Sequence, residues 1–178
     1  MMYDPKDWYW EAADGRVFAS ARVAVVDDTD AGFAAWRADG NEATPWPRDG
    51  AGEQTVVALQ QVLTPHGLFA DLRAYAEMKR WEAEVGGIVV AGVPISTDDR
   101  SKQMLMGARI AAQANPAFST PWVAADGVVA TLGAVEVIAV SDAVLAHVQG
   151  CFETFALVVD DIAMGAITTT AAIDAAFA

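Results

Sequence analysis

The sequence lacks most of the features that mark the common functional classes. It has one cysteine, Cys151, so no internal disulfide can form. Its 11 basic residues form no cluster and stand against 24 acidic ones, which gives a formal net charge of −13. A field of this sign repels phosphate backbones and anionic membrane surfaces, so we expect no nucleic acid and no membrane among the partners.

Nucleotide-binding and catalytic motifs are also missing. No GxGxxG stretch follows a predicted strand, and no glycine-rich loop precedes a Lys-Ser or Lys-Thr pair. His66 stands between Pro65 and Gly67, and spacing places neither a serine nucleophile nor a carboxylate beside it. We therefore predict that the chain is not an enzyme and that it binds no cofactor.

Metal binding is not predicted either. Three acidic clusters, at residues 27–30, 98–99 and 160–161, lack the alternating oxygen ligands, turn glycine and distal glutamate of a calcium loop. Helix capping and solvent exposure explain them better. His147 and Cys151 are four residues apart and share a helix face, but two ligands without a third and fourth make a weak site. We assign no metal ligand.

Long hydrophobic runs are absent as well. Apolar stretches are interrupted by Glu, Asp or Gly before the ~20 residues that a bilayer requires, so no membrane span is predicted. Residues 1–10 hold no basic region followed by an apolar run, so we expect no secretory signal and a bacterial cytoplasm as the place of synthesis. Since 54% of the residues are hydrophobic and only 20% are charged, the chain is expected to fold.

Residues 1–45 are predicted to form a small unit of a β-hairpin and a helix. Asp14-Gly15 joins two strand-like segments and can supply the positive φ angles of a type I′ turn. The helix after this hairpin carries Phe33 and Trp36 on one face and ends at Gly40. Residues 41–52 contain two prolines and two glycines and are typical of a linker. The second predicted segment, 46–70, combines this linker with a short helix.

Residues 71–178 are predicted to form a mostly helical domain with short β-hairpins, so the fold class is α+β. A helix begins at Asp71, and its apolar stripe consists of Ala74, Met78, Trp81 and Val85. Hairpins follow at 88–95, with Pro94 on an edge, and at 122–131. Between them a helix begins at Thr97 or Asp98 and runs to about Asn115.

A last long helix is predicted from residue 134 to residue 164. Two rows of residues repeat along it every seven positions, the spacing with which helices pack along a shared stripe. The rows are Ile138, Leu145, Phe152 and Val159, and then Ser141, Val148, Phe155 and Ile162. Either this face packs on the rest of its own chain, or the seam from Ile138 to Ile162 joins copies into a homo-oligomer. The sequence leaves both open.

Four aromatic residues are candidates for binding a partner. Trp8, Tyr9 and Trp10 follow one another, and a strand alternates its faces, so at least one ring is expected to point outward. Trp46 lies between two prolines in a stiff, extended segment. Because Trp and Tyr dominate binding hot spots, these four rings form either a docking surface or part of a core.

Two parts of the sequence resemble proteins of bacteriophage tails. From about Asp71 to the end, an ordered pattern resembles a small domain of unassigned biochemistry that recurs in tail-fibre and tail-fibre-assembly regions of phages and prophages. The pattern consists of Lys79-Arg80-Trp81, Gly86-Gly87, Thr97-Asp98-Asp99-Arg100-Ser101, Ala117-Phe118, Trp122 and Val128 to Leu132. The opening, Tyr3 to Trp10 with Asp14 to Val17, resembles the start of small tail-fibre-assembly proteins, which bind or chaperone the fibre tip.

The resemblance implies a structural component of a phage tail, associated with the tail tip or the tail fibre. The alternative that it implies is an assembly factor, a chaperone that binds the fibre and is not retained in the virion. In both cases the partners are other phage tail or fibre proteins, and the location is the virion tail after synthesis in the host cytoplasm. Neither resemblance carries catalytic residues. The sequence also has no long repetitive shaft such as a mature fibre contains.

Overall fold

The computed structural model describes residues 3–178, so the first two residues of the predicted N-terminal unit lie outside the described residues. The chain divides into two compact units. Unit 1 contains the residues up to Ala76 together with Asp161–Asp174, and unit 2 contains Glu77–Asp160 and Ala175–Ala178. Helices and short strands occur in both units, which confirms the α+β class.

Unit 1 is built on a four-stranded sheet with the strand order β3-β2-β1-β4. The strands are β1 (Tyr9–Glu11), β2 (Val17–Ala19), β3 (Ala24–Val26) and β4 (Thr44–Pro45), and β4 runs parallel to β1. Two helices accompany the sheet, α1 (Ala31–Ala38) and α2 (Val56–Leu63), with 3₁₀ turns at Pro5–Asp7, Ser20–Arg22 and Thr64–His66. Residues 41–52 therefore belong to the fold of unit 1, and the prediction of a linker there was wrong.

The turn between β1 and β2 differs from the predicted type I′ turn. Gly15 has a φ of +87°, but Asp14 does not share the positive φ that this turn type requires at both central residues. Instead the Gly15 N–H donates to the Ala12 carbonyl at 3.0 Å, and the Ala12 N–H donates to the Arg16 carbonyl at 2.8 Å. The connection is a four-residue turn followed by a bulge at Gly15, which adds one residue to the loop.

Both faces of the unit 1 sheet are covered. Because side chains alternate along β1, Tyr9 and Trp10 enter two different cores. In the first core Tyr9 packs with Phe33 and Trp36 of α1. In the second core Trp10 packs with Trp46 and with residues of α2. The second core consists of Trp10, Ala12, Phe18, Trp46, Leu59, Leu63 and Ala70. The expectation that one ring of the Trp8-Tyr9-Trp10 run points outward was wrong, since a helix lies over each face.

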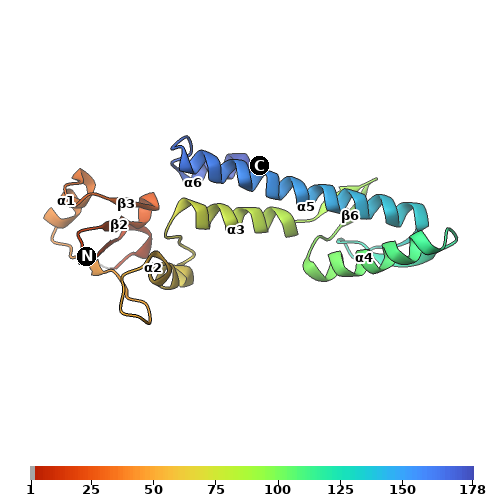
Figure 1. The fold of residues 1–178 in the computed structure, drawn as a ribbon, viewed down its shortest axis with the longest axis horizontal. Helices are drawn as coiled ribbons and strands as arrows, with labels where there is room; N and C mark the ends of the chain where they lie inside the picture. The colour runs from red at the N-terminus through yellow and green to blue at the C-terminus, as the bar shows by residue number, and fades with distance from the viewer. Residues whose placement is uncertain (1–2) are drawn as a thin grey trace. The chain divides into compact units, whose positions relative to one another are not determined.

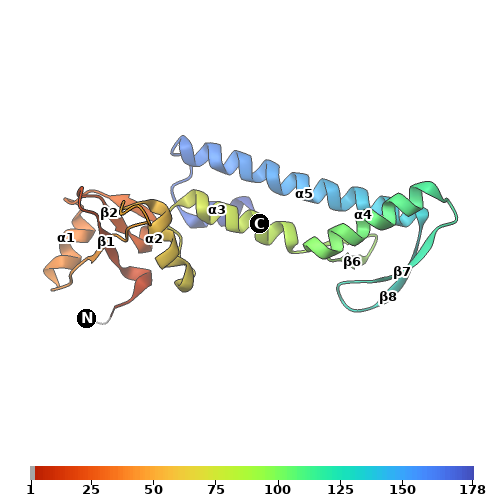
Figure 2. The same cartoon turned by 60° about the horizontal axis from the view of Figure 1, so that its bottom comes forward.

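Unit 2 contains two hairpins and the long helix α5 (Ala134–Ala163). The elements before α5 are α3 (Leu72–Val85), β5 (Ile88–Val90), β6 (Val93–Ile95), α4 (Asp99–Ala114), β7 (Ser119–Val123) and β8 (Val129–Gly133). The first turn of α3, the end of α5 and most of α6 (Thr170–Ala176) belong to unit 1. Within unit 2, α4 lies along the N-terminal half of α5 and the end of α3 lies along its C-terminal half (Figures 1 and 2). Each half of α5 thus has one helix beside it.

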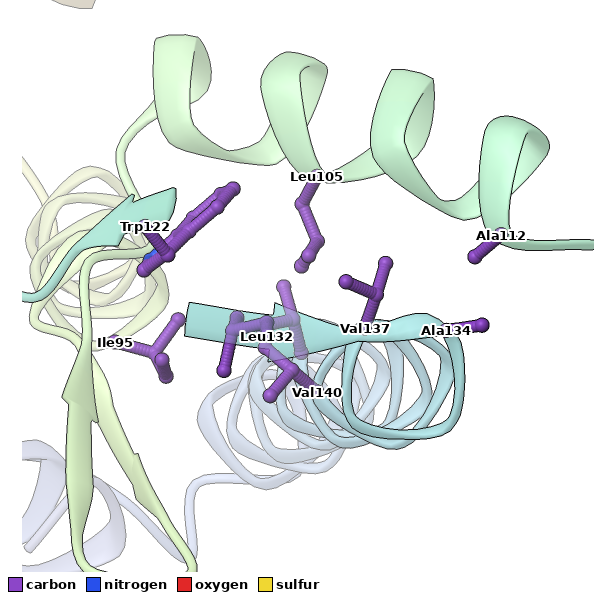
Figure 3. Close-up of a cluster of buried hydrophobic side chains, with 9 residues drawn as sticks. Ile95, Leu105, Ala112, Trp122, Leu132, Ala134, Val137 and Val140 are labelled. Carbon is purple, nitrogen blue, oxygen red and sulfur yellow. The ribbon is translucent and has the colours of Figure 1, made fainter. Parts of the chain in front are cut away.

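The core of unit 2 lies between α4, the hairpins and the first turns of α5. Leu105 of α4 and Trp122 of β7 point into the same space as Leu132 of β8 and Val137 of α5 (Figure 3). Ile95, at the end of β6, adds to this cluster. In register, Val89 of β5 faces Pro94 of β6, and Pro121 of β7 faces Thr131 of β8.

Candidate interaction surface

The row of α5 that is buried by its own chain is displaced by one residue from the predicted row. Val137, Val144, Cys151 and Val158 are buried and lie seven residues apart. The predicted row of Ile138, Leu145, Phe152 and Val159, which we call the α5 row, lies beside it. Leu145 is 54% and Phe152 50% exposed, while Ile138 and Val159 are half-buried. The α5 row therefore lies at the edge of the face that packs on the chain itself.

The displacement has a physical cause in the wide apolar face of the helix. Adjacent heptad positions differ by about 100° around a helix, so a face this wide permits either row to be central. The contacts of α4 decide between them, because Leu105 and Ala112 pack against Val137, Val140 and Val144. The α5 row then lies at the edge of the packed face, half in contact with the chain and half exposed.

Helix α3 faces α5 with charged residues rather than with its predicted apolar stripe. Trp81 is 55% exposed, whereas the side chains of Arg80 and Glu84 are only 13% and 12% exposed. Arg80 pairs with Glu84, and its guanidinium lies 4.4 Å from the centre of the Phe152 ring. Glu84 also pairs with Lys102 of α4. The prediction that Trp81 belongs to a packed stripe was wrong, because Arg80 and Glu84 lie on the shielded side of α3 and the Trp81 ring lies largely outside.

This ion-pair cluster holds its groups in their charged forms. Hydrogen bonding from Lys102, together with the positive charges of Lys102 and Arg80, keeps the pKa of Glu84 below its ordinary value. Hydrogen bonding to Glu84 raises the pKa of Lys102. The cluster therefore fixes Arg80, and Arg80 in turn fixes one face of the Phe152 ring.

The exposed flank of the α5 row includes acidic residues. The residues four positions after the members of the row are Asp142, Gln149, Ala156 and Ala163, and only the first is acidic. Asp142 forms an ion pair with Arg109 of α4. Two further exposed acids of α5, Glu153 and Asp160, lie near the same line of the helix, because Asp160 follows Asp142 by about five helical turns.

His147 and Cys151 lie together but do not form a catalytic pair. The His147 Nε2 is 3.0 Å from the Ala83 carbonyl oxygen and 3.8 Å from the Cys151 Sγ. A carbonyl oxygen only accepts, so Nε2 carries the proton and cannot act as a base toward the thiol. Burial raises the pKa of the Cys151 thiol, with the charge of Glu84 adding to the effect. Among residues 3–178, no group of three His, Cys, Asp or Glu side chains is placed to hold a metal ion.

The same contacts show what His147 and Thr97 do. Both serve the C-terminal end of α3, where helix carbonyls have no partner within the helix. His147 donates to the Ala83 carbonyl, and the Thr97 hydroxyl donates to the Glu84 carbonyl at 2.6 Å while accepting from the Gly87 N–H at 2.9 Å. These side chains close the helix end and do not form a reaction centre.

The four aromatic candidates lie mostly inside unit 1. Trp10 and Trp46 are 0% and 2% exposed, and Tyr9 is buried. Trp8 is half-buried and donates its indole N–H to the Thr44 hydroxyl at 2.9 Å. The Trp46 indole N–H donates to the Thr55 carbonyl at 2.9 Å. Of the two alternatives, the structure supports the core for these rings, and we withdraw the docking surface.

An open groove lies beside β4. It has a volume of about 810 Å³ and is lined by residues that include Glu11, Pro45, Trp46 and Gln54. The Gln54 amide is already committed, because its oxygen accepts from the Ala13 N–H at 2.7 Å and its nitrogen donates to the Trp46 carbonyl at 2.8 Å. These bonds tie the loop to the sheet.

The acidic clusters near residues 30 and 98 cap helices, as the sequence predicts. Asp30 accepts from the Phe33 N–H at 2.9 Å at the start of α1, and it forms a two-point ion pair with Arg22. These hydrogen bonds lower the pKa of Asp30. Asp98 accepts from the Ser101 N–H at 3.0 Å at the start of α4. His66 lies in a 3₁₀ turn, where its ring is near that of Tyr3.

Helix α5 is also long and apolar enough to cross a membrane by length and composition. This differs from the prediction of no span, because the interruptions by Asp and Glu are too sparse to lower the average over 18 residues. Only 22% of that apolar window is buried within the chain. The rest of that window is half-buried or exposed.

Fold and surface together define an α+β protein in which most of the exposed large apolar residues lie in unit 2. Residues 68–177 match the family model described as Domain of unknown function (DUF4376), which covers more than half of the chain. The chain belongs to the DUF4376 family. No curated protein and no solved structure matched it.

Proposed function

We propose that this protein is a structural component of a bacteriophage tail, associated with the tail tip or tail fibre, and that it acts through protein–protein contacts. The observation that carries the contact function is the exposed apolar surface of α5, of which Leu145 and Phe152 are the clearest members. The tail as the place of action follows from the sequence resemblance of residues 71–178 and of the N-terminal opening.

The exposed surface is costly for an isolated chain. Burying a Leu or Phe side chain contributes roughly 1.5–3 kcal/mol, and about half of this remains unused at each of Leu145 and Phe152. Exposed apolar patches of this kind mark interaction sites in soluble proteins. A permanent neighbour in a particle would recover this energy.

Mass spectrometry of purified particles of the parent phage tests the proposal. We expect the chain to be present at a fixed, low ratio to the tail-tube protein. Particles that lack their tails provide the control, because the chain should be absent from them. Absence from complete particles, with detection in the lysate bound to a tail or fibre protein, would favour the assembly factor instead. Absence from particles and from every complex with a tail or fibre protein would contradict both functions.

A further inference from the structure

We propose that the open groove beside β4 binds an arginine side chain of a partner protein, and that the Glu11 carboxylate recognises the guanidinium group. The groove, which we call the β4 groove, is lined by residues of unit 1, whereas the exposed Leu145 and Phe152 of α5 belong to unit 2. The inference therefore rests neither on the phage tail nor on the surface of α5.

The β4 groove lies on a face of the unit 1 sheet that α1 covers only in part. On this face Tyr9 and Val17 are buried together with Phe33 of α1. Because side chains alternate along a strand, Glu11 projects from the same face as Tyr9, two residues further along β1. In register, Glu11 lies between Val17 of β2 and Pro45 of β4. Val17 is fully buried and Pro45 is exposed, so the cover by α1 ends at Glu11.

The floor of the β4 groove beside Glu11 consists of small and rigid residues. Ala13 continues this face of β1, and Ala43, Pro45 and Pro47 alternate along the neighbouring segment on the same face. Alanine and proline lose almost no side-chain entropy when they are covered. Such a floor suits the methylene stem of a long side chain whose charged end lies elsewhere. The volume of about 810 Å³ is within the range of ligand sites.

Glu11 is a half-buried carboxylate that no neighbour neutralises. Among residues 3–178 its side chain forms no hydrogen bond and no ion pair. The nearby Arg16 is committed elsewhere, because it pairs with Asp14 and donates to the Gln54 carbonyl at 3.0 Å. A half-buried carboxylate without a partner has lost part of its hydration without compensation. A cation that reaches Glu11 therefore restores what burial has removed.

The charges around Glu11 favour a basic partner over an acidic one. The net charge of −13 attracts basic groups to the chain as a whole. The pKa of Asp28 is raised, first by its hydrogen bond with Asp27 and to a smaller extent by nearby charges that include Glu11. Arg48 also lines the groove, but it donates to the Gly52 carbonyl at 2.6 Å and forms no ion pair with Glu11. Its charge would repel a second base, so the groove accepts one basic side chain.

The arrangement favours a guanidinium over a metal ion or an ammonium group. A metal ion requires several ligands, and within the described part of the chain no three His, Cys, Asp or Glu side chains are placed to hold one. A guanidinium forms two parallel hydrogen bonds with a single carboxylate and is more weakly hydrated than an ammonium group. Arginine thus makes the fullest use of one half-buried carboxylate beside an apolar floor.

A nuclear magnetic resonance titration of the isotope-labelled full chain tests the inference. The probe is the peptide acetyl-Ala-Arg-Ala-amide, and acetyl-Ala-citrulline-Ala-amide is its control, because citrulline has nearly the same shape without the charge. We expect saturable shifts of the backbone amides of Glu11, Ala13 and Ala43 with the arginine peptide. The dissociation constant of the citrulline peptide should be higher by about tenfold.

Two glutamates provide a matched pair of variants. Glu11→Gln and Glu42→Gln each remove one carboxylate and keep its shape, but Glu42 is exposed and is not among the residues that line the groove. Glu11→Gln should raise the dissociation constant of the arginine peptide by about tenfold, which corresponds to ~1.4 kcal/mol, and Glu42→Gln should leave it unchanged. The indole N–H resonances of Trp10 and Trp46 check that both variants fold. If Glu11→Gln does not fold, the two peptides compared on the wild type still decide.

Four outcomes would overturn the inference. The first is the absence of saturable shifts at the groove, with only small shifts spread over the acidic surface. The second is equal affinity for the arginine and citrulline peptides. The third is an equal response of Glu11→Gln and Glu42→Gln. The fourth is tighter binding of acetyl-Ala-Glu-Ala-amide than of the arginine peptide, with shifts centred on Arg48, which would assign the groove to acidic partners.

Discussion

The two units of the protein bury their large side chains to very different degrees. Unit 1 contains four fully buried aromatic residues, Trp10, Phe18, Phe33 and Trp46, packed on both faces of its sheet. In unit 2 the fully buried side chains are no larger than Ile95, and most of the exposed large apolar residues of the described chain lie in this unit. Unit 1 therefore buries larger side chains than unit 2, and unit 2 leaves more of its large apolar side chains exposed.

The charged groups show the same division. The ion pair of Arg22 and Asp30 in unit 1 is at the surface and caps a helix. In unit 2 the side chains of Arg80, Glu84 and Lys102 form a cluster that is largely shielded from solvent. A cluster of ions fixes orientation but contributes less net stability than apolar packing. Unit 2 thus combines its apolar core with a shielded ion-pair cluster.

The largest difference in stability between the two units is expected when a tryptophan of each is replaced by alanine. Trp10→Ala should lower the stability of unit 1 by about 3–5 kcal/mol, because a fully buried ring leaves a cavity. Trp81→Ala in unit 2 should change stability by less than about 0.5 kcal/mol, since its ring is largely exposed. Native-state hydrogen exchange reports on each unit separately. A large loss with Trp81→Ala would mean that unit 2 has a core that the comparison overlooks.

A smaller effect is expected at the junction of α3 and β5. Gly87 has a φ of +85°, and a Cβ there would lie 3.0 Å from the Ile95 carbonyl oxygen. Gly87→Val should therefore destabilise unit 2 by about 1–3 kcal/mol, as thermal unfolding can measure. Gly150→Ala is the control, because the space around Gly150 is open and alanine favours the helix. An unchanged midpoint for Gly87→Val would show that this junction tolerates rearrangement.

The smallest effect is expected on the stability of unit 2 at acidic pH, when Glu84 is replaced. The pKa of Glu84 is lowered in the folded state, so this group stabilises unit 2 above the ordinary carboxyl pKa and loses that contribution as the pH falls through the lowered value. Glu84→Gln should cost about 1–2 kcal/mol near neutral pH and flatten the acid dependence of exchange in α4 below about pH 4. Exchange in β1 provides the internal control. If hydrogen exchange in α4 depends on pH in the same way in Glu84→Gln and in the wild type, Glu84 does not cause the acid dependence of stability.

Local signals in the sequence predicted most of the elements. Asp30 and Asp98 mark the starts of α1 and α4, and the fold places both as caps. Ala91-Gly92 forms the predicted tight hairpin, with both φ angles positive. Such features depend on a few neighbouring residues, which is why the α+β class could be derived without tertiary information.

Apart from the turn at Gly15 and the apolar length of α5, the errors depend on contacts between residues that are distant in the sequence. Residues 41–52 have the composition of a linker, yet β4 pairs with β1 and Trp46 enters the core. The α5 row was identified by its spacing, but which of two adjacent rows the chain buries depends on α4. The role of Arg80 and Glu84 was missed. Their spacing of four residues was the available signal, since such pairs lie on one side of a helix.

The hairpin registers have a consequence for aggregation. The Ala124 N–H bonds to the Val128 carbonyl, so the backbone of Pro121, three residues earlier, points away from β8. Pro94 has the same outward position in β6, and its carbonyl accepts from the Ala125 N–H at 2.9 Å. A proline in this position offers no N–H to a strand from another molecule. The ribbons of unit 2 thus carry their own protection against edge-to-edge pairing on these two sides, although apolar residues such as Val89 and Val123 lie exposed on them.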